Sequence, residues 1–199
     1  MENKLTENIA RNFELPLPDG ATMDQQLDAI LPKIKPWGED LYETQYYVGT
    51  RWLQIQDDDH FHESILHIFF DEEAEGGERV YLISIDGNIT KGLWKILEKS
   101  NTLILEKIDD GGNSFTSELY DLAFLNKDFF ILKKHGNQVR KGGKKYFVLA
   151  REGAVRGLEW RDVMELLYNQ YRNNSAYIMA LVALVIVVFG ILLYSFMVR

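Results

Sequence analysis

The chain has 199 residues, no cysteine and a net charge of −8. The acidic balance argues against a general nucleic-acid-binding protein, because neutralising phosphates requires a basic surface. The lack of cysteine excludes disulfides, thiol catalysis and cysteine-based zinc sites, and no sequence motif for a cofactor is present.

Residues 1–21 form a polar arm in which we find no apolar region typical of a secretory signal. A short helix is expected at the start of the following domain, residues 22–150. Thr22 and Gln25 have the spacing of a capping box, which satisfies free N–H groups at a helix start. Apolar residues then recur with a helical period, at Met23, Leu27, Ile30, Leu31 and Ile34.

Residues 46–150 contain short apolar runs separated by turn residues, a pattern typical of β-strands. Asp86 and Gly87, between two such runs, indicate a hairpin because both residues tolerate a positive φ. About eight short strands predict a mainly β fold, namely an antiparallel up-and-down barrel or a sandwich. The predicted strands are Tyr46–Gln56, Glu63–Phe70, Arg79–Asp86, Asn88–Glu98, Thr102–Ile108, Phe115–Leu125, Asp128–Lys134 and Lys145–Ala150.

Residues 151–175 are expected to form an amphipathic helix and a spacer. Helical periodicity returns from Val155 to Arg172. One apolar stripe of this helix comprises Trp160, Met164, Leu167 and Tyr171. The polar residues Asn173, Asn174 and Ser175 predict a short break after it.

Residues 176–198 hold no charged side chain. A helix of this length spans about 34 Å, enough to cross the hydrocarbon core of a bilayer. We therefore expect one transmembrane helix that acts as a tail anchor. Basic residues upstream, including Arg172, outnumber the single Arg199 beyond it. The positive-inside rule then predicts a single-pass membrane protein whose N-terminal domain is cytoplasmic.

The same segment carries a stripe of small residues, and small residues allow helices to approach closely in lipid. This stripe predicts contact with a second copy or with another membrane protein. An alternative is that small residues are simply common in such helices. The stripe consists of Ala176, Ala180, Ala183, Val187 and Gly190.

The central region resembles the lipocalin-like (calycin) domains, which are small up-and-down barrels. The resemblance rests on the order of a G-x-W strand, a T-L-x-L strand, a glycine-rich turn, an aromatic strand and a second apolar strand. It implies a barrel with a small apolar interior that can hold a ligand, and it implies no catalytic residues. The segments that carry it are Gly92–Leu97, Asn101–Leu105, Asp109–Asn113, Phe115–Leu125 and Phe129–Leu132, while Gly49–Trp52 resembles the opening strand with one additional residue.

A PH-like fold is the alternative architecture. It also contains an antiparallel meander, of seven strands, and is closed by a C-terminal helix that often inserts a tryptophan. Trp160 on the Val155–Arg172 helix fits that description. We favour the lipocalin-like fold because the apolar runs divide more readily into eight strands than into seven.

His60 and His62 are weak candidates for metal ligands. Two histidines two residues apart on a strand point to the same face and can share a metal. His67 has the opposite parity and is expected to face the other side. The alternative is a solvated acidic turn that leads into a strand, and we favour it because no second histidine cluster supplies further ligands.

A basic segment stands out in this acidic chain. It is suited to contact anionic lipid headgroups or an acidic partner, at about 1 kcal/mol per basic residue near a membrane surface. The alternative is an ordinary hairpin kept soluble by its charge. Its cations are Lys133, Lys134, Arg140, Lys141, Lys144 and Lys145.

These observations favour a non-enzymatic, membrane-tethered barrel that serves as an accessory or adaptor subunit of a membrane assembly. A second hypothesis is a carrier or sensor that holds an apolar small molecule or lipid in the barrel. A PH-like headgroup-binding domain and an enzyme whose site forms only on folding are further alternatives. A large apolar cavity favours the carrier, whereas a filled interior favours the adaptor.

Overall fold

The computed structural model describes residues 22–58, 64–73, 79–108, 114–136 and 143–197. Asp19–Met164 belong to one compact unit, which contains all the strands, and the chain from Glu165 onward belongs to a second. The first unit contains the candidate site.

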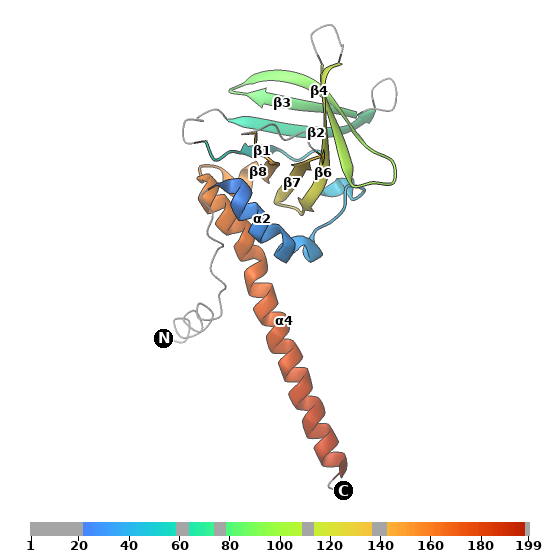
Figure 1. Cartoon of the computed structure of the whole chain (residues 1–199), viewed down its shortest axis with the longest axis vertical. Helices are drawn as coiled ribbons and strands as arrows, with labels where there is room; N and C mark the ends of the chain where they lie inside the picture. Colours follow the sequence, from blue (N-terminus) through green and yellow to red (C-terminus); the bar gives the residue numbers. More distant parts are fainter. Residues whose placement is uncertain (1–21, 59–63, 74–78, 109–113, 137–142, 198–199) are drawn as a thin grey trace. The chain divides into compact units, whose positions relative to one another are not determined.

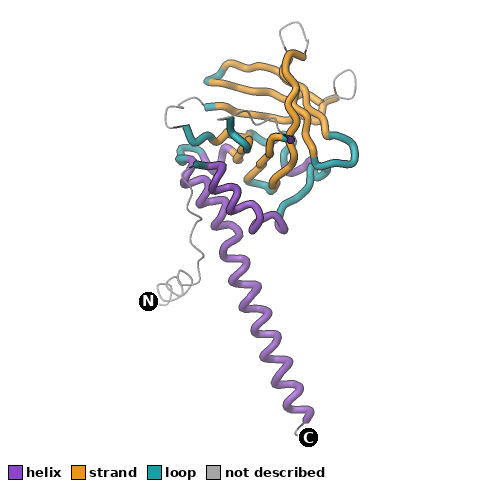
Figure 2. The backbone as a smooth tube through the Cα atoms, in the orientation of Figure 1, coloured by secondary structure: helices purple, strands orange, loops and turns teal. Residues whose placement is uncertain are grey.

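Eight antiparallel strands form a closed barrel in which each strand pairs with its sequence neighbours and β8 closes on β1 (Figures 1 and 2). This confirms the predicted mainly β, eight-stranded up-and-down barrel. The seven strands of the PH-like alternative do not match it, and Trp160 is partly exposed. The strands are β1 (Trp52–Ile55), β2 (Ile65–Glu73), β3 (Arg79–Ile85), β4 (Asn88–Ile96), β5 (Thr102–Ile108), β6 (Ser114–Leu125), β7 (Phe129–Lys134) and β8 (Tyr146–Arg151).

The turn between β3 and β4 has the predicted hairpin geometry. Asp86 and Gly87 both have positive φ values, 47° and 90°. Ile85 pairs with Asn88 across this two-residue turn. The backbone twist of such a turn matches the twist of the strands, so these two residues fix the register of the hairpin.

One half of the barrel interior is filled by large side chains. Trp52 donates its indole N–H to the carbonyl of Tyr47 at 3.0 Å, and both residues are fully buried. The indole N–H of Trp94 lies 3.0 Å from the carbonyl of Phe70 and 3.1 Å from that of Val80. These bonds satisfy the only polar atoms of the two indoles, which makes their burial favourable. The same half also contains Phe69, Leu103, Phe130 and Leu149.

The first strand is shorter than predicted. The prediction began it at Tyr46, but Thr44–Tyr46 form a short 3₁₀ helix (η2) and β1 starts at Trp52. Gly49 has a φ of 71°, in the left-handed region that favours glycine, and interrupts the extended chain. The β-favouring residues before Gly49 therefore do not extend the strand. One of them, Tyr47, packs inside the barrel against Phe69, with ring centroids 5.9 Å apart.

Helix α2 (Met23–Ile34) packs beside β6 and is joined to β8 by a hydrogen bond from the hydroxyl of Tyr146 to Asp28. Thr22 caps it by accepting a hydrogen bond from the backbone N–H of Gln25, which confirms the predicted helix start. Asp24 accepts hydrogen bonds from the backbone N–H groups of Lys145 and Tyr146, at 2.8 and 3.3 Å, and so attaches the helix to the start of β8. A second 3₁₀ turn, η1 (Lys35–Trp37), follows α2.

Two helices follow the barrel, α3 (Glu152–Val155) and α4 (Trp160–Met197). The predicted break at residues 173–175 is absent, because α4 continues through it. Asn and Ser cost only about 0.5 kcal/mol each in a helix, which is less than the cost of starting a new helix. Among the described residues, no helix is both long and apolar enough to cross a membrane. The side chains of residues 172–181 and 192–199 fall outside the described set.

Candidate functional site

The open half of the barrel contains a cavity of about 580 Å³. Its lining comes from all eight strands, near the ends of β1, β3, β5 and β7 and the beginnings of the strands that follow them. Small-molecule sites in proteins have volumes of about 300–1,000 Å³, so the cavity has the size of a ligand site. Its apolar walls include Ile65, Ile83, Leu105 and Phe147.

His67 and Tyr81 form the aromatic floor of the cavity. Their rings are stacked with centroids 6.2 Å apart and 9° between the planes. Phe147 packs edge-on against His67 at 5.2 Å. Both His67 and Tyr81 line the cavity although their side chains are almost fully buried. They separate the open half of the barrel from the filled half.

The position of Tyr81 depends on Gly92. The two residues pair directly between β3 and β4. A Cβ at position 92 would come within 2.1 Å of Cε1 of Tyr81 and 2.7 Å of the carbonyl oxygen of Glu106. Only glycine leaves room for the tyrosine ring over the β4 backbone, which explains the glycine of the G-x-W strand.

His67 is a neutral imidazole at neutral pH. Burial, assisted by the nearby charge of Lys107, lowers the pKa of His67 from 6.5 to about 3. Its Nε2 lies 3.1 Å from Oε1 of Gln54 on β1. Its Nδ1 is buried and has no hydrogen-bond partner among the described residues.

Three charged residues of the open half lie on the inner faces of β5, β6 and β7. Nζ of Lys134 is 3.5 Å from Oε1 of Glu118, and Oε2 of Glu118 accepts a 2.7 Å hydrogen bond from the hydroxyl of Tyr120. Burial opposes ionisation of Glu118, but Tyr120, Lys134 and Lys107 outweigh it and lower the pKa of Glu118. Burial and the neighbouring Glu118 raise the pKa of Tyr120. These three strands therefore bring two ammonium groups and one carboxylate to the open half, and Lys91 and Lys144 also line the cavity.

The mouth of the cavity is tied to α2. Asp57, just beyond β1, accepts a 2.6 Å hydrogen bond from Nζ of Lys144 and a 2.9 Å bond from the backbone N–H of Met23. Burial opposes ionisation of Asp57, but these bonds outweigh it and lower the pKa of Asp57. Lys144 and Tyr146 also line the cavity, so the contact that positions α2 also shapes the rim.

Acidic residues of this same chain pair with part of the predicted basic segment. Nζ of Lys145 lies 2.5 Å from Oδ1 of Asp28 on α2, and Lys144 and Lys134 pair with Asp57 and Glu118 as described above. Lys133 is exposed. Arg140 and Lys141 lie outside the described residues. Contact of the segment with lipid or with an acidic partner stays a prediction.

The predicted metal ligands His60 and His62 lie outside the described residues. Within the described ranges, no three His, Asp or Glu side chains are grouped closely enough to hold a metal ion.

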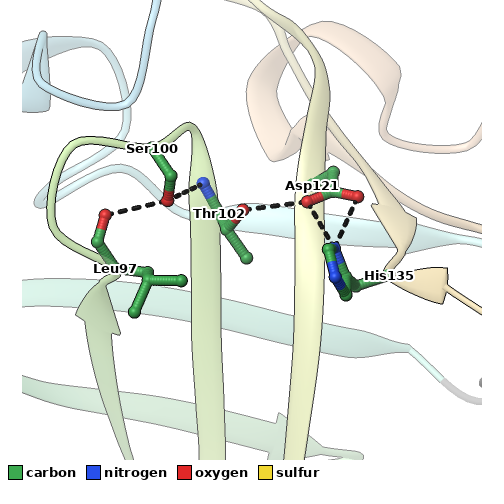
Figure 3. A network of polar contacts seen from close by, with 5 residues as sticks. All are labelled: Leu97, Ser100, Thr102, Asp121 and His135. Atoms are coloured by element: carbon green, nitrogen blue, oxygen red, sulfur yellow. Dashed lines mark hydrogen bonds and ion pairs between the residues drawn. The ribbon is translucent and has the colours of Figure 1, made fainter.

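Another polar network lies on the outer surface, where β5, β6 and the end of β7 meet (Figure 3). Asp121 accepts a 2.9 Å hydrogen bond from the hydroxyl of Thr102 and lies 2.9 Å from Nδ1 of His135. The carboxylate stands between the hydroxyl and the imidazole, whereas activation of a hydroxyl nucleophile requires the imidazole in the middle. The network therefore joins three strands and does not resemble a nucleophilic site.

The small-residue stripe is described only in part. Ala183, Val187 and Gly190 are exposed on α4, and a Cβ placed at Gly190 meets no described atom within 4 Å other than those of its chain neighbours and its own helix backbone. The side chains of Ala176 and Ala180 lie outside the described residues.

No protein-family model matches the chain, and no curated protein or solved structure matches it either. The geometry of this chain's own residues therefore carries the functional conclusion.

Of the predicted site residues, Lys134 and Lys144 line the cavity, although they were predicted to contact lipid or an acidic partner; the other cavity residues were not predicted. Gln54, His67, Lys107 and Glu118 come from four different strands, β1, β2, β5 and β6. A partial signal was present for His67, because its parity places it on the face opposite to His60 and His62. The sequence did not indicate which of the two faces is the interior.

Proposed function

We propose that the barrel binds a small amphipathic anion and acts as a carrier or sensor. The observation that carries this proposal is the cavity of about 580 Å³ with apolar walls in the open half of the barrel. An adaptor that uses the barrel only as a rigid surface would have a filled interior. The cavity therefore favours ligand binding over the adaptor role.

The charges of the open half favour an anionic group on the ligand. Within the described ranges, Lys107 forms no ion pair and acts on Glu118 only through its longer-range charge, while Lys134 pairs with Glu118 at 3.5 Å. Lys134 is partly buried, where Coulomb interactions are stronger than in water, whereas Lys107 is exposed at the rim. The apolar part of the ligand would pack against Ile65, Ile83 and Leu105.

We also assign the barrel to the lipocalin-like folds. Support comes from the closed eight-stranded up-and-down topology and from the role of Gly92 and Trp94 in the G-x-W strand. Trp94 is fully buried at the filled end, and Gly92 makes room for the cavity floor. Ligands of such barrels occupy the interior, as proposed for this chain.

The C-terminal helix is proposed to be a membrane anchor. Residues 176–198 are uncharged. On α4, the large apolar side chains between residues 182 and 191 are exposed, from 48% at Val188 to 65% at Ile186. An apolar band of this extent requires a lipid or protein environment. Alkaline extraction of membranes should leave the full chain in the pellet and release a chain that ends at residue 175; release of both would contradict the anchor.

This tail also offers a surface for a second copy or for another membrane protein. Ala183 and Gly190 lie on its exposed part, where close helix packing is sterically possible. Gly190→Leu is expected to reduce any oligomer observed by cross-linking in membranes. An unchanged oligomer would exclude this side of the helix as the contact.

Calorimetric titration of the full chain in lipid nanodiscs tests the ligand proposal, with empty nanodiscs as the blank. Decanoate and decyltrimethylammonium share an apolar chain and differ in the sign of their charge. We expect decanoate to bind at least tenfold more tightly. Lys107→Gln should weaken decanoate binding severalfold, whereas Lys127→Gln, in the turn between β6 and β7, should not. Equal binding of the two amphiphiles, or no binding, would contradict the proposal.

A further inference from the structure

The floor of the cavity is a continuous layer of four aromatic rings. Tyr81 on β3 stacks with His67 on β2, with ring centroids 6.2 Å apart. Phe147 on β8 packs against His67 at 5.2 Å and against Tyr120 on β6 at 5.5 Å. All four residues line the cavity, so the layer extends across the barrel. Fully buried side chains of the filled half lie behind it and do not line the cavity, among them Phe69, Leu103 and Phe130.

The distance from this aromatic layer to the rim is short. On β3 the cavity lining extends from Tyr81 to Ile85, the last residue of the strand, and on β6 it extends from Tyr120 to Thr116. A rise of about 3.3 Å per residue and a strand tilt of about 40° give a depth of about 10 Å along the barrel axis. With C–C bonds of about 1.5 Å, an extended alkyl chain of about eight carbons has this length.

We propose that the aromatic layer limits the length of the ligand, so that the barrel binds medium-chain amphipathic acids and gains no affinity from longer chains. This inference rests on the proposed function and specifies its ligand class. The anionic group lies at the rim toward Lys107 and Lys134. The chain runs inward along Ile83 and Leu105 and ends at the ring of Tyr81, and the additional methylenes of a longer acid remain outside the mouth. Tyr81 is therefore a specificity-determining residue.

A series of straight-chain acids tests this limit with the wild-type full chain in nanodiscs. Calorimetry measures the affinities of hexanoate, octanoate, decanoate and dodecanoate, referred to the free acid concentration that titration of empty nanodiscs supplies. Two methylenes that become buried raise an affinity about tenfold. We expect this gain from hexanoate to octanoate. From decanoate to dodecanoate we expect a change of at most about twofold, because methylenes outside the mouth bury little surface.

Tyr81→Ala tests whether the ring of Tyr81 sets the limit. Its removal uncovers Phe69, which stacks on Tyr81 at 5.6 Å, and opens space below the floor. In a folded Tyr81→Ala chain, verified by circular dichroism, dodecanoate should bind at least about fivefold more tightly than decanoate, because its last methylenes become buried. Tyr42→Ala is the matched control, because the side chain of Tyr42 is exposed. This variant should bind decanoate and dodecanoate as the wild type does.

The wild-type series does not depend on the folding of any variant. A tenfold gain from decanoate to dodecanoate in the wild type would show that the chain bends above the layer or passes it, and would overturn the length limit. A plateau that persists in folded Tyr81→Ala would overturn the role of Tyr81. Both results would leave the ligand cavity in place, whereas binding of none of the four acids would overturn the proposed function together with this inference.

Discussion

Gly92 on β4 lies directly beneath the ring of Tyr81 on β3. A Cβ at position 92 would be 2.1 Å from Cε1 of that ring, a distance that no real contact shows. On its opposite side Tyr81 stacks with its neighbours on β2, Phe69 at 5.6 Å and His67 at 6.2 Å. The missing side chain of one glycine thus positions the aromatic layer that separates the filled half of the barrel from the cavity.

Gly92→Ala is expected to destabilise the barrel by about 1–3 kcal/mol, the usual cost of overpacking a core. Denaturant unfolding of the full chain measures this difference. Gly153→Ala in α3 is the matched control, because a Cβ there meets nothing within 4 Å and alanine favours a helix. Equal unfolding free energies for Gly92→Ala and the wild type would show that Tyr81 moves aside without cost.

Asp57→Ala is expected to lower the free energy of unfolding by about 1.5–3 kcal/mol. The substitution removes a carboxylate that is hydrogen-bonded to Lys144 and to the N–H of Met23. Asp71→Ala is the control: it removes an ion pair with Arg79 in which the aspartate side chain is 62% exposed, against 15% for Asp57. Exposed pairs contribute at most about 1 kcal/mol. Similar losses for the two variants would contradict the role of Asp57 in attaching α2.

Acidification is expected to destabilise the protein through His67. Its pKa is about 3 in the folded state against an ordinary value of 6.5. The unfolded chain therefore binds one proton more between these pH values, and the free energy of unfolding falls as the pH drops below 6.5. The loss at pH 5 is roughly 2 kcal/mol. His67→Phe should show a correspondingly smaller decline between pH 7 and pH 5, and identical slopes would contradict a buried neutral histidine.

Most of the fold could be predicted because local signals agreed with the global topology. The N-cap at Thr22 and the Asp86–Gly87 turn depend on residues that are adjacent in sequence. The first strand was overextended because Tyr46, Tyr47 and Val48 favour strands, whereas Gly49 adopts a left-handed conformation that ends the run. Asn173–Ser175 do not break the helix, because the strong helical segments on both sides continue through them.

The site was much less predictable. Its residues come from separate strands, and their meeting depends on the register and closure of the barrel. Alternation did not reveal the interior face of β7, because Phe129–Leu132 are buried on both faces. The spacing of His60 and His62 predicted metal ligands. The lowered pKa of His67, in contrast, results from burial that only the folded barrel provides.

Blocking the cavity tests the central claim most directly. Ile83 points into the cavity, whereas Leu82, its neighbour on β3, points to the outer face because side chains alternate along a strand. The measurement is the calorimetric affinity of decanoate for the full chain in nanodiscs, for the wild type, Ile83→Trp and Leu82→Trp, with circular dichroism to verify folding. We predict that Ile83→Trp loses at least tenfold in affinity while Leu82→Trp binds like the wild type. Undiminished binding by a folded Ile83→Trp would contradict a ligand site inside the barrel.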